Sequence, residues 1–229
     1  MSKFLSLVVA ASAVMSVASA NAADLIVEPA VDPVVESEPG DWYVSLFVGG
    51  VWSEGDTTIS PEGNPDVGYT FGMDMEMGYT LGLAVGTEIF ENLRGEVELS
   101  VIQSHPDSFF GSPSSDEITS TGINLLGNLW YDIDTGTGFT PYVGGGLGVG
   151  YTELTSDSSD DNINATGLVY QLGAGVTVAM TDSLALDLGY RYKVMPDAAV
   201  DGDFVSPGYD ITLDATSHVV QAGLTYKFN

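Results

Sequence analysis

From Trp42 to the C-terminus, apolar and polar side chains alternate residue by residue in segments separated by stretches rich in Gly, Pro, Ser and Asp. A period of two is typical of β-strands with one apolar and one polar face. It predicts eight strands, near residues 42–52, 70–88, 93–103, 118–132, 140–153, 165–180, 184–195 and 215–228. Each is long enough to cross a bilayer as a tilted strand, which requires about 9–11 residues.

The alternation assigns individual side chains to faces. Segment 70–88 carries its large apolar residues on one face: Phe71, Met73, Met75, Met77, Tyr79, Leu81, Leu83 and Val85. Its other face carries small and polar residues, among them Asp74 and Glu76. In segment 184–195, leucines and tyrosines oppose Asp187, Arg191 and Lys193. Each strand should therefore present one face to an apolar environment and the other to a polar one.

The connections between the segments alternate between long and short. Four are long and polar, near 53–69, 104–117, 154–164 and 196–214, and three are short, near 89–92, 133–139 and 181–183. Period-two segments alone would also fit a soluble sandwich or a lipocalin, whose apolar faces point inward. Alternating loop lengths and a Gly-rich polar face favour a narrow membrane barrel instead. We predict an all-β fold, a transmembrane eight-stranded antiparallel up-and-down β-barrel over residues 42–229.

Aromatic residues lie near the ends of the predicted strands, as expected where a barrel meets the two bilayer interfaces. A periplasmic girdle would contain Trp42, Phe90, Trp130, Tyr131, Phe139, Tyr226 and Phe228. An external girdle would contain Trp52, Tyr69, Phe71, Tyr151, Tyr170 and Tyr192.

The first 41 residues differ from the rest. Residues 1–22 have the basic start, apolar centre and small-residue end of a secretory signal peptide, with cleavage after Ala20 or Ala22. The apolar stretch of about 14 residues is short of the roughly 20 that a transmembrane helix needs. No other segment approaches that length, so we expect a mature chain without a transmembrane helix. Residues 23–41 mix acids with prolines and are expected to form a periplasmic linker.

The composition narrows the function classes. The chain has 32 acidic and only 5 basic residues, a net charge of −27, which argues against nucleic acid as a partner. A disordered acidic chain is disfavoured by the 44% hydrophobic content and by the positive mean hydropathy of +0.17. There is no cysteine, so a disulfide framework and a thiolate metal site are both excluded.

The polar faces of the predicted strands collect most of the basic residues together with several acids. Buried charges are tolerated when they are paired, so we expect a structural charge network in the lumen. Its predicted members are Asp74, Glu76, Arg94, Glu96, Glu98, Asp187, Arg191 and Lys193; Glu88 and Lys227 share the same face. The network could line a polar pore or plug the lumen. An eight-stranded barrel is just filled by its side chains, which favours a plug.

The candidates for chemistry are weak. Ser217 and His218 are adjacent in a strand and should point to opposite faces, and the pair Ser104 and His105 begins a loop. The acidic run 157–161 lacks the spacing of a calcium loop, and the glycines of 144–150 lie within a strand pattern with no helix after them. We therefore predict no catalytic residue, no metal ligand and no cofactor site.

Several segments resemble the small outer-membrane β-barrel family, often labelled porin-family proteins, which overlaps the barrel domain of outer-membrane protein A. The resembling stretches are Asp41–Leu46, Thr140–Gly148, Tyr170–Val176, Thr181–Tyr192 and Val220–Phe228. The resemblance implies insertion by the barrel-assembly machinery, which recognises the C-terminal strand. Family members commonly end on an aromatic residue, whereas Phe228 is followed here by Asn229.

Three functions remain open from the sequence. The first is a structural and surface barrel of a Gram-negative outer membrane that displays acidic external loops. The second is a narrow pore for small solutes or ions, and the third is an adhesin or recognition protein whose loops bind an unidentified ligand. In each case the expected partners include outer-membrane lipid and lipopolysaccharide.

Overall fold

The computed structural model describes residues 42–64, 67–106, 108–109, 112–113, 118–156, 159–201 and 208–228. The predicted signal peptide and linker, residues 1–41, lie outside the described residues. The strands are β1 Trp42–Pro61, β2 Tyr69–Asp74, β3 Gly78–Phe90, β4 Leu93–Ser104, β5 Ser108–Phe109, β6 Ser112–Pro113, β7 Ile118–Asp132, β8 Phe139–Ser156, β9 Ser159–Ala179, β10 Leu184–Asp201 and β11 Tyr209–Lys227. The described part of the chain contains no helix that is both long and apolar enough to cross a membrane.

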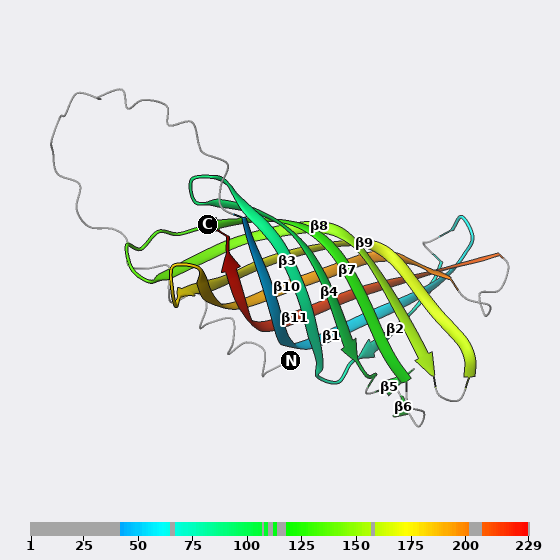
Figure 1. Cartoon of the computed structure of the whole chain (residues 1–229). Coiled ribbons are helices and arrows are strands. Elements are labelled where there is room, and N and C mark those ends of the chain that lie inside the picture. Colours follow the sequence, from blue (N-terminus) through cyan, green and yellow to red (C-terminus); the bar gives the residue numbers. More distant parts are fainter. Residues whose placement is uncertain are drawn as a thin grey trace, which may run out of the picture. The chain divides into compact units, whose positions relative to one another are not determined.

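Nine of the strands form one antiparallel sheet that closes on itself (Figure 1). The order is β2-β1-β3-β4-β7-β8-β9-β10-β11, and β11 also pairs with β1. Because β2 and β3 pair with successive parts of the same strand β1, they share one position in the wall. The predicted eight-stranded up-and-down barrel is therefore confirmed. The remaining strands, β5 and β6, form a separate small hairpin.

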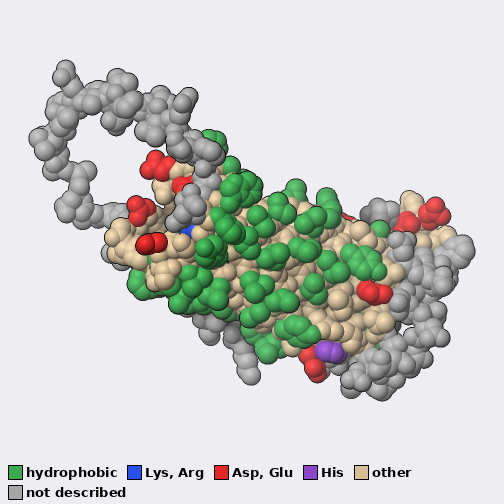
Figure 2. Space-filling view, viewed as in Figure 1, with side chains coloured by type: hydrophobic (Ala, Val, Ile, Leu, Met, Phe, Trp, Pro, Cys, Tyr) green, Lys and Arg blue, Asp and Glu red, His purple; other side chains and the backbone are tan. Residues whose placement is uncertain are grey.

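The alternating side chains form an apolar outer surface around the middle of the barrel. In β3, for example, Tyr79, Leu81, Leu83 and Val85 are exposed while their neighbours are buried. Figure 2 shows hydrophobic side chains gathered over the broad side of the barrel, with acidic residues mostly toward its ends. Trp42 and Trp52 both point outward from β1. Ten residues of a tilted strand span about 25 Å, the height of the apolar band of membrane barrels.

Most of the predicted girdle residues are exposed, but Trp130 lies inside the barrel. Trp130 is only 1% exposed and faces the lumen, whereas the adjacent Tyr131 is 53% exposed. Neighbouring residues of a strand point to opposite faces, so both could not have reached the lipid interface. Phe71 is 37% exposed and lines a cavity on the inner side of the wall.

The strands are longer than the sequence predicts and continue past the external girdle. β1 runs nine residues beyond Trp52 to Pro61, and β11 begins nine residues before His218, the residue opposite Trp52. These extensions add about 20 Å of wall beyond the apolar band. Much of the sequence predicted as external loops is therefore strand. The acidic Glu54 and Asp56 of the predicted loop 53–69 lie on β1 with exposed side chains.

A β-bulge separates β2 from β3 and reverses the faces of the second predicted strand. Val51 pairs with Gly78, but Glu54 pairs with Asp74, so two residues of β1 oppose three residues, 75–77. One extra residue moves every later side chain to the opposite face. Met73 consequently lines the lumen, and Asp74 and Glu76 are exposed. The expectation that Phe71, Met73 and Met75 share the lipid face of Tyr79 is wrong for this reason, whereas Met77 is exposed on the outer face as predicted.

A second bulge lies at the same end of the barrel, in β10. Met195 pairs with Ala215, but Ala198 pairs with Leu213, and Asp197 between them has a positive φ of 47°. Below the bulge the odd-numbered residues of β10 face inward. After the bulge, toward the end of β10, Ala198 and Val200 face inward instead, and Ala198 is completely buried.

Small residues in the lumen make room for large ones from other strands. The Tyr142 side chain of β8 is buried across the backbone of Gly175 in β9. A methyl group added at Gly175 would collide with the Tyr142 ring and with the carbonyl oxygen of Leu188. The same relation holds between Gly86 and the Tyr43 ring. The glycine-rich polar face thus accommodates a lumen filled by aromatic and charged side chains.

We expect Gly175→Ala to lower the free energy of unfolding by about 1–3 kcal/mol, because Tyr142 must move to relieve the overlap. The measurement is the urea midpoint of the barrel refolded in detergent micelles. Gly138→Ala is the matched control, since nothing lies within 4 Å of the added carbon in that turn. Equal midpoints for the two variants would contradict the close packing described.

Candidate functional site: the charged and aromatic lumen

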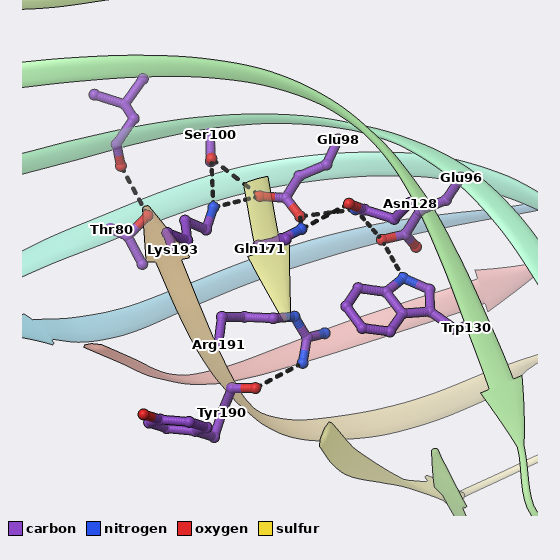
Figure 3. A network of polar contacts seen from close by, with 11 residues as sticks. Thr80, Glu96, Glu98, Ser100, Asn128, Trp130, Gln171, Tyr190, Arg191 and Lys193 are labelled. Carbon is purple, nitrogen blue, oxygen red and sulfur yellow. Dashed lines mark hydrogen bonds and ion pairs between the residues drawn. The ribbon is translucent and has the colours of Figure 1, made fainter. Parts of the chain in front are cut away.

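The centre of the lumen is occupied by a buried ion pair (Figure 3). Lys193 Nζ of β10 lies 2.7 Å from Glu98 Oε1 of β4, and both side chains are about 95% buried or more. Ser100 donates to the same carboxylate oxygen, and Asn128 and Gln171 each donate to Oε2 at 3.0 Å. Glu98 is therefore fully hydrogen-bonded by groups from four strands, β4, β7, β9 and β10. Such satisfaction is what makes a buried charge pair tolerable.

A second group lies against the ion pair and is held by an arginine. The Arg191 guanidinium carbon is 4.2 Å from the centre of the Trp130 ring, and Nη2 donates to the Tyr142 hydroxyl at 3.0 Å. Tyr142 in turn donates to Asp187 Oδ1 at 2.9 Å. Arg191 and Asp187 are thus joined through the Tyr142 hydroxyl. The Nε of Arg191 is buried without a hydrogen-bond partner among the described residues.

A third group lies toward the turn between β7 and β8. Arg94 makes a two-pronged ion pair with Asp132, at 2.6 Å and 2.8 Å. Tyr43 donates to Glu96 Oε2, and Trp130 donates from Nε1 to Glu96 Oε1. Asn128 Nδ2 also donates to Glu96 and so connects this group to the central ion pair. The three groups form one continuous network, which we call the lumen plug.

The structure brings six of the eight predicted lumen charges into the plug: Arg94, Glu96, Glu98, Asp187, Arg191 and Lys193. Asp74 and Glu76 lie outside it and are exposed, because the bulge at residues 75–77 turns them outward. Glu88 and Lys227, predicted on the same face, are also exposed.

The uncharged members of the plug were not identified from the sequence. They are Tyr43, Ser100, Asn128, Trp130, Tyr142 and Gln171. The acidic Asp132, which pairs with Arg94, was also not among the predicted members. A signal for several of them was present. Strand 118–132 carries Asn124, Asn128, Trp130 and Asp132 at even positions, the face opposite its apolar Ile123, Leu125 and Leu129.

The Ser–His pairs do not form nucleophile–base pairs. Ser217 is hydrogen-bonded to Ser53 at 2.8 Å, whereas the adjacent His218 ring is hydrogen-bonded to the Tyr190 hydroxyl on the outer face. Ser104 is buried and His105 is exposed. Within the described ranges, no group of three or more His, Asp or Glu side chains is arranged to hold a metal ion. The side chains of the acidic run 157–161 lie outside those described.

A closed antiparallel barrel with an apolar band of bilayer height and a polar, filled lumen defines a class of protein that spans a membrane with strands. The model of the outer membrane protein β-barrel domain family matches residues 9–228. The chain belongs to this family and is an outer-membrane protein.

Similar proteins agree with this assignment. An uncharacterized protein of Brucella suis is 26% identical over 276 aligned positions, which cover 94% of this chain and 95% of that protein. The outer membrane protein PagN of Salmonella typhimurium is 25% identical over 176 positions, covering 69% of this chain and 73% of PagN. The solid-state NMR structure of the outer membrane protein AlkL has a TM-score of 0.56 at 19% identity, covering 89% of this chain and 97% of AlkL. This last likeness concerns the fold alone.

Lys193→Met should lower the free energy of unfolding by about 3–5 kcal/mol, because it leaves the buried Glu98 without its counter-charge. The double change Lys193→Met with Glu98→Gln should recover most of the loss. The readout is the urea midpoint in micelles, with Lys227→Met as the control at an exposed lysine. A Lys193→Met barrel as stable as the wild type would show that the pair contributes nothing.

Arg191→Ala should lower the free energy of unfolding by about 2 kcal/mol, and with it the urea midpoint. The substitution removes the contact with Trp130 and the hydrogen-bond donor to Tyr142. Arg191→Lys should be intermediate, because an ammonium group keeps the charge but not the planar stacking. Tryptophan fluorescence during unfolding provides the measurement. An unchanged midpoint for Arg191→Ala would contradict the role given to the arginine.

Proposed function

We propose that this protein is a structural and surface barrel of a Gram-negative outer membrane whose lumen is closed to solutes. The observation that carries the proposal is the lumen plug, in which charged and aromatic side chains meet across the barrel axis. Glu98 and Lys193 are separated by 95 positions in sequence and by 2.7 Å in space. Side chains held by several hydrogen bonds each do not readily move aside for a passing solute.

The space left beside the plug supports the same proposal. A cavity of about 30 Å³ lies among Arg94, Glu98, Trp130 and Arg191. That volume corresponds to about two water molecules. A diffusion pore would need a continuous aqueous path, as in barrels of 16–18 strands.

Surface recognition is a second candidate function, and the extended wall favours it. The strands continue about 20 Å beyond the apolar band. Glu54 and Asp74 lie opposite each other on β1 and β2 and are exposed, as is Asp56. This surface would suit a basic partner, because the sequence places no lysine or arginine in the external part of these strands.

Export and assembly are part of the proposal. Residues 1–22 would direct export as a cleaved signal peptide, and residues 23–41 would form a periplasmic linker. The last strand would then be recognised by the barrel-assembly machinery. Every second residue of this strand faces outward, with Val220, Leu224 and Tyr226 exposed. The Phe228 ring packs edge-on against the Tyr226 ring, with 5.1 Å between the ring centres.

Planar-bilayer recording tests the closed lumen. The refolded wild-type barrel should give no discrete conductance steps, because the plug blocks the path for ions. A triple variant, Glu98→Ser with Arg191→Ser and Lys193→Ser, should conduct if its gel mobility shows that it is folded, and it serves as the positive control. Steps from the wild-type protein would refute the proposal and favour the narrow-pore alternative.

A further inference from the structure

The external part of the lumen differs in chemistry from the plug. A cluster of buried apolar side chains begins at the level of the Lys193–Glu98 pair and continues beyond it: Leu126, Ala165, Val169, Met195, Ala198 and Leu213. Beyond the apolar band of the outer surface, which we call the apolar belt, a cavity of about 210 Å³ lies next to part of this cluster. Phe71, Met73, Ile163, Ala165 and Leu213 are in its wall. All of the residues lining it, except Thr57, are apolar or glycine.

The two bulges contribute three of the apolar residues of this wall, Phe71, Met73 and Val200. Without the bulge at residues 75–77, Asp74 would face inward in place of Phe71 and Met73. Without the bulge between Met195 and Ala198, Val200 would point outward. Both irregularities lie near the end of the outer apolar band, at the level where Glu54 and Asp56 follow Trp52 on β1. Beyond that level the outer surface needs no apolar side chains, and these residues line the inside instead.

Apolar walls around a cavity of this size are costly when they face water and favourable when they contact an apolar molecule. A cavity of about 150 Å³ lined by Leu, Ile and Phe is enough to bind benzene. The cavity described here is larger and lined in the same way. A single ring with small substituents, or a short alkyl chain, would fit it.

The surrounding charges restrict the ligand further. Glu54, Asp74 and Asp197 are exposed on the outer face of the extended wall, and no lysine or arginine lies beyond Lys193 in this direction. Lys193 itself is neutralised by Glu98. An anion would therefore be repelled, and a strongly hydrated cation would lose its hydration in the apolar wall.

We infer that the cavity between β1, β2, β8, β9, β10 and β11, beyond the apolar belt, binds an uncharged apolar molecule of about the size of one aromatic ring or a short alkyl chain. The site is separate from the plug and is compatible with a closed lumen, because it is reached from the external end. It does not depend on the structural role proposed above.

The methionines of the barrel allow a direct test with toluene as the probe. Met73 lines the cavity, whereas Met180 is 58% exposed at the opposite end of the barrel. The protein is labelled with ¹³C at the methionine methyl groups, placed in lipid nanodiscs and titrated with toluene. The Met73 resonance should shift and saturate, while the Met180 resonance should follow only the partition of toluene into lipid, without saturation.

Two variants separate the cavity from the rest of the barrel. Ala165→Phe should fill the cavity and raise the apparent dissociation constant at least about tenfold, because the aromatic side chain takes the place of the probe. Leu213→Asn should weaken binding by making the wall polar, and it covers the case in which Ala165→Phe fails to fold. Ala222→Phe, on the lipid-facing surface of β11, is the matched control and should bind as the wild type does.

A Met73 shift that is absent in the wild-type protein, or that rises linearly in parallel with Met180, overturns the inference. So does saturable binding that Ala165→Phe and Leu213→Asn both leave unchanged. Conductance plays no part in this readout, so the result is independent of whether the lumen is closed.

Discussion

A backbone that crosses hydrocarbon must pair its own N–H and C=O groups, since no water is present to do so. In this chain the requirement is met by the pairing of the first strand with the last, from Tyr43 opposite Lys227 to Pro61 opposite Tyr209. Closure removes the edges of the sheet and fixes the direction of every side chain, outward or inward. The apolar belt, the crowded lumen and the two changes of face at the bulges are all consequences of how each strand meets this constraint.

The lumen is divided into two zones of different chemistry. In the membrane zone, three basic side chains are held among acids, amides and aromatic rings, and the glycines opposite them provide the space. In the external zone, apolar side chains face inward and acids face outward, the reverse of the membrane zone. The change occurs near the end of the outer apolar band, where a single extra residue between β2 and β3 and another in β10 turn Phe71, Met73 and Val200 inward.

This division bears on what the protein can do. A network in which each acid accepts several hydrogen bonds would hold its side chains across the barrel axis, and this supports the proposed scaffold over a channel. The cavity inside the external zone is lined by neither the charged side chains nor the hydrogen bonds of the plug. Recognition, whether of a partner at the acidic outer face or of a small apolar molecule inside, is therefore best placed there, on a wall held rigid by the plug below it.

The period-two pattern by itself determined the strand number, the antiparallel barrel and the inward direction of Arg94, Glu98, Arg191 and Lys193, because closure makes alternation and orientation equivalent. It also held the information that Trp130 and Tyr131 point to opposite faces. The inward turn of Met73, the outward turn of Asp74 and Glu76 and the cavity above the belt were decided only by the tertiary structure. A bulge shifts the register by one residue through pairing with a neighbouring strand. The contact of Arg191 with Trp130 depends on the width of the closed barrel. The alternation of apolar and polar residues in the sequence reveals neither of these features.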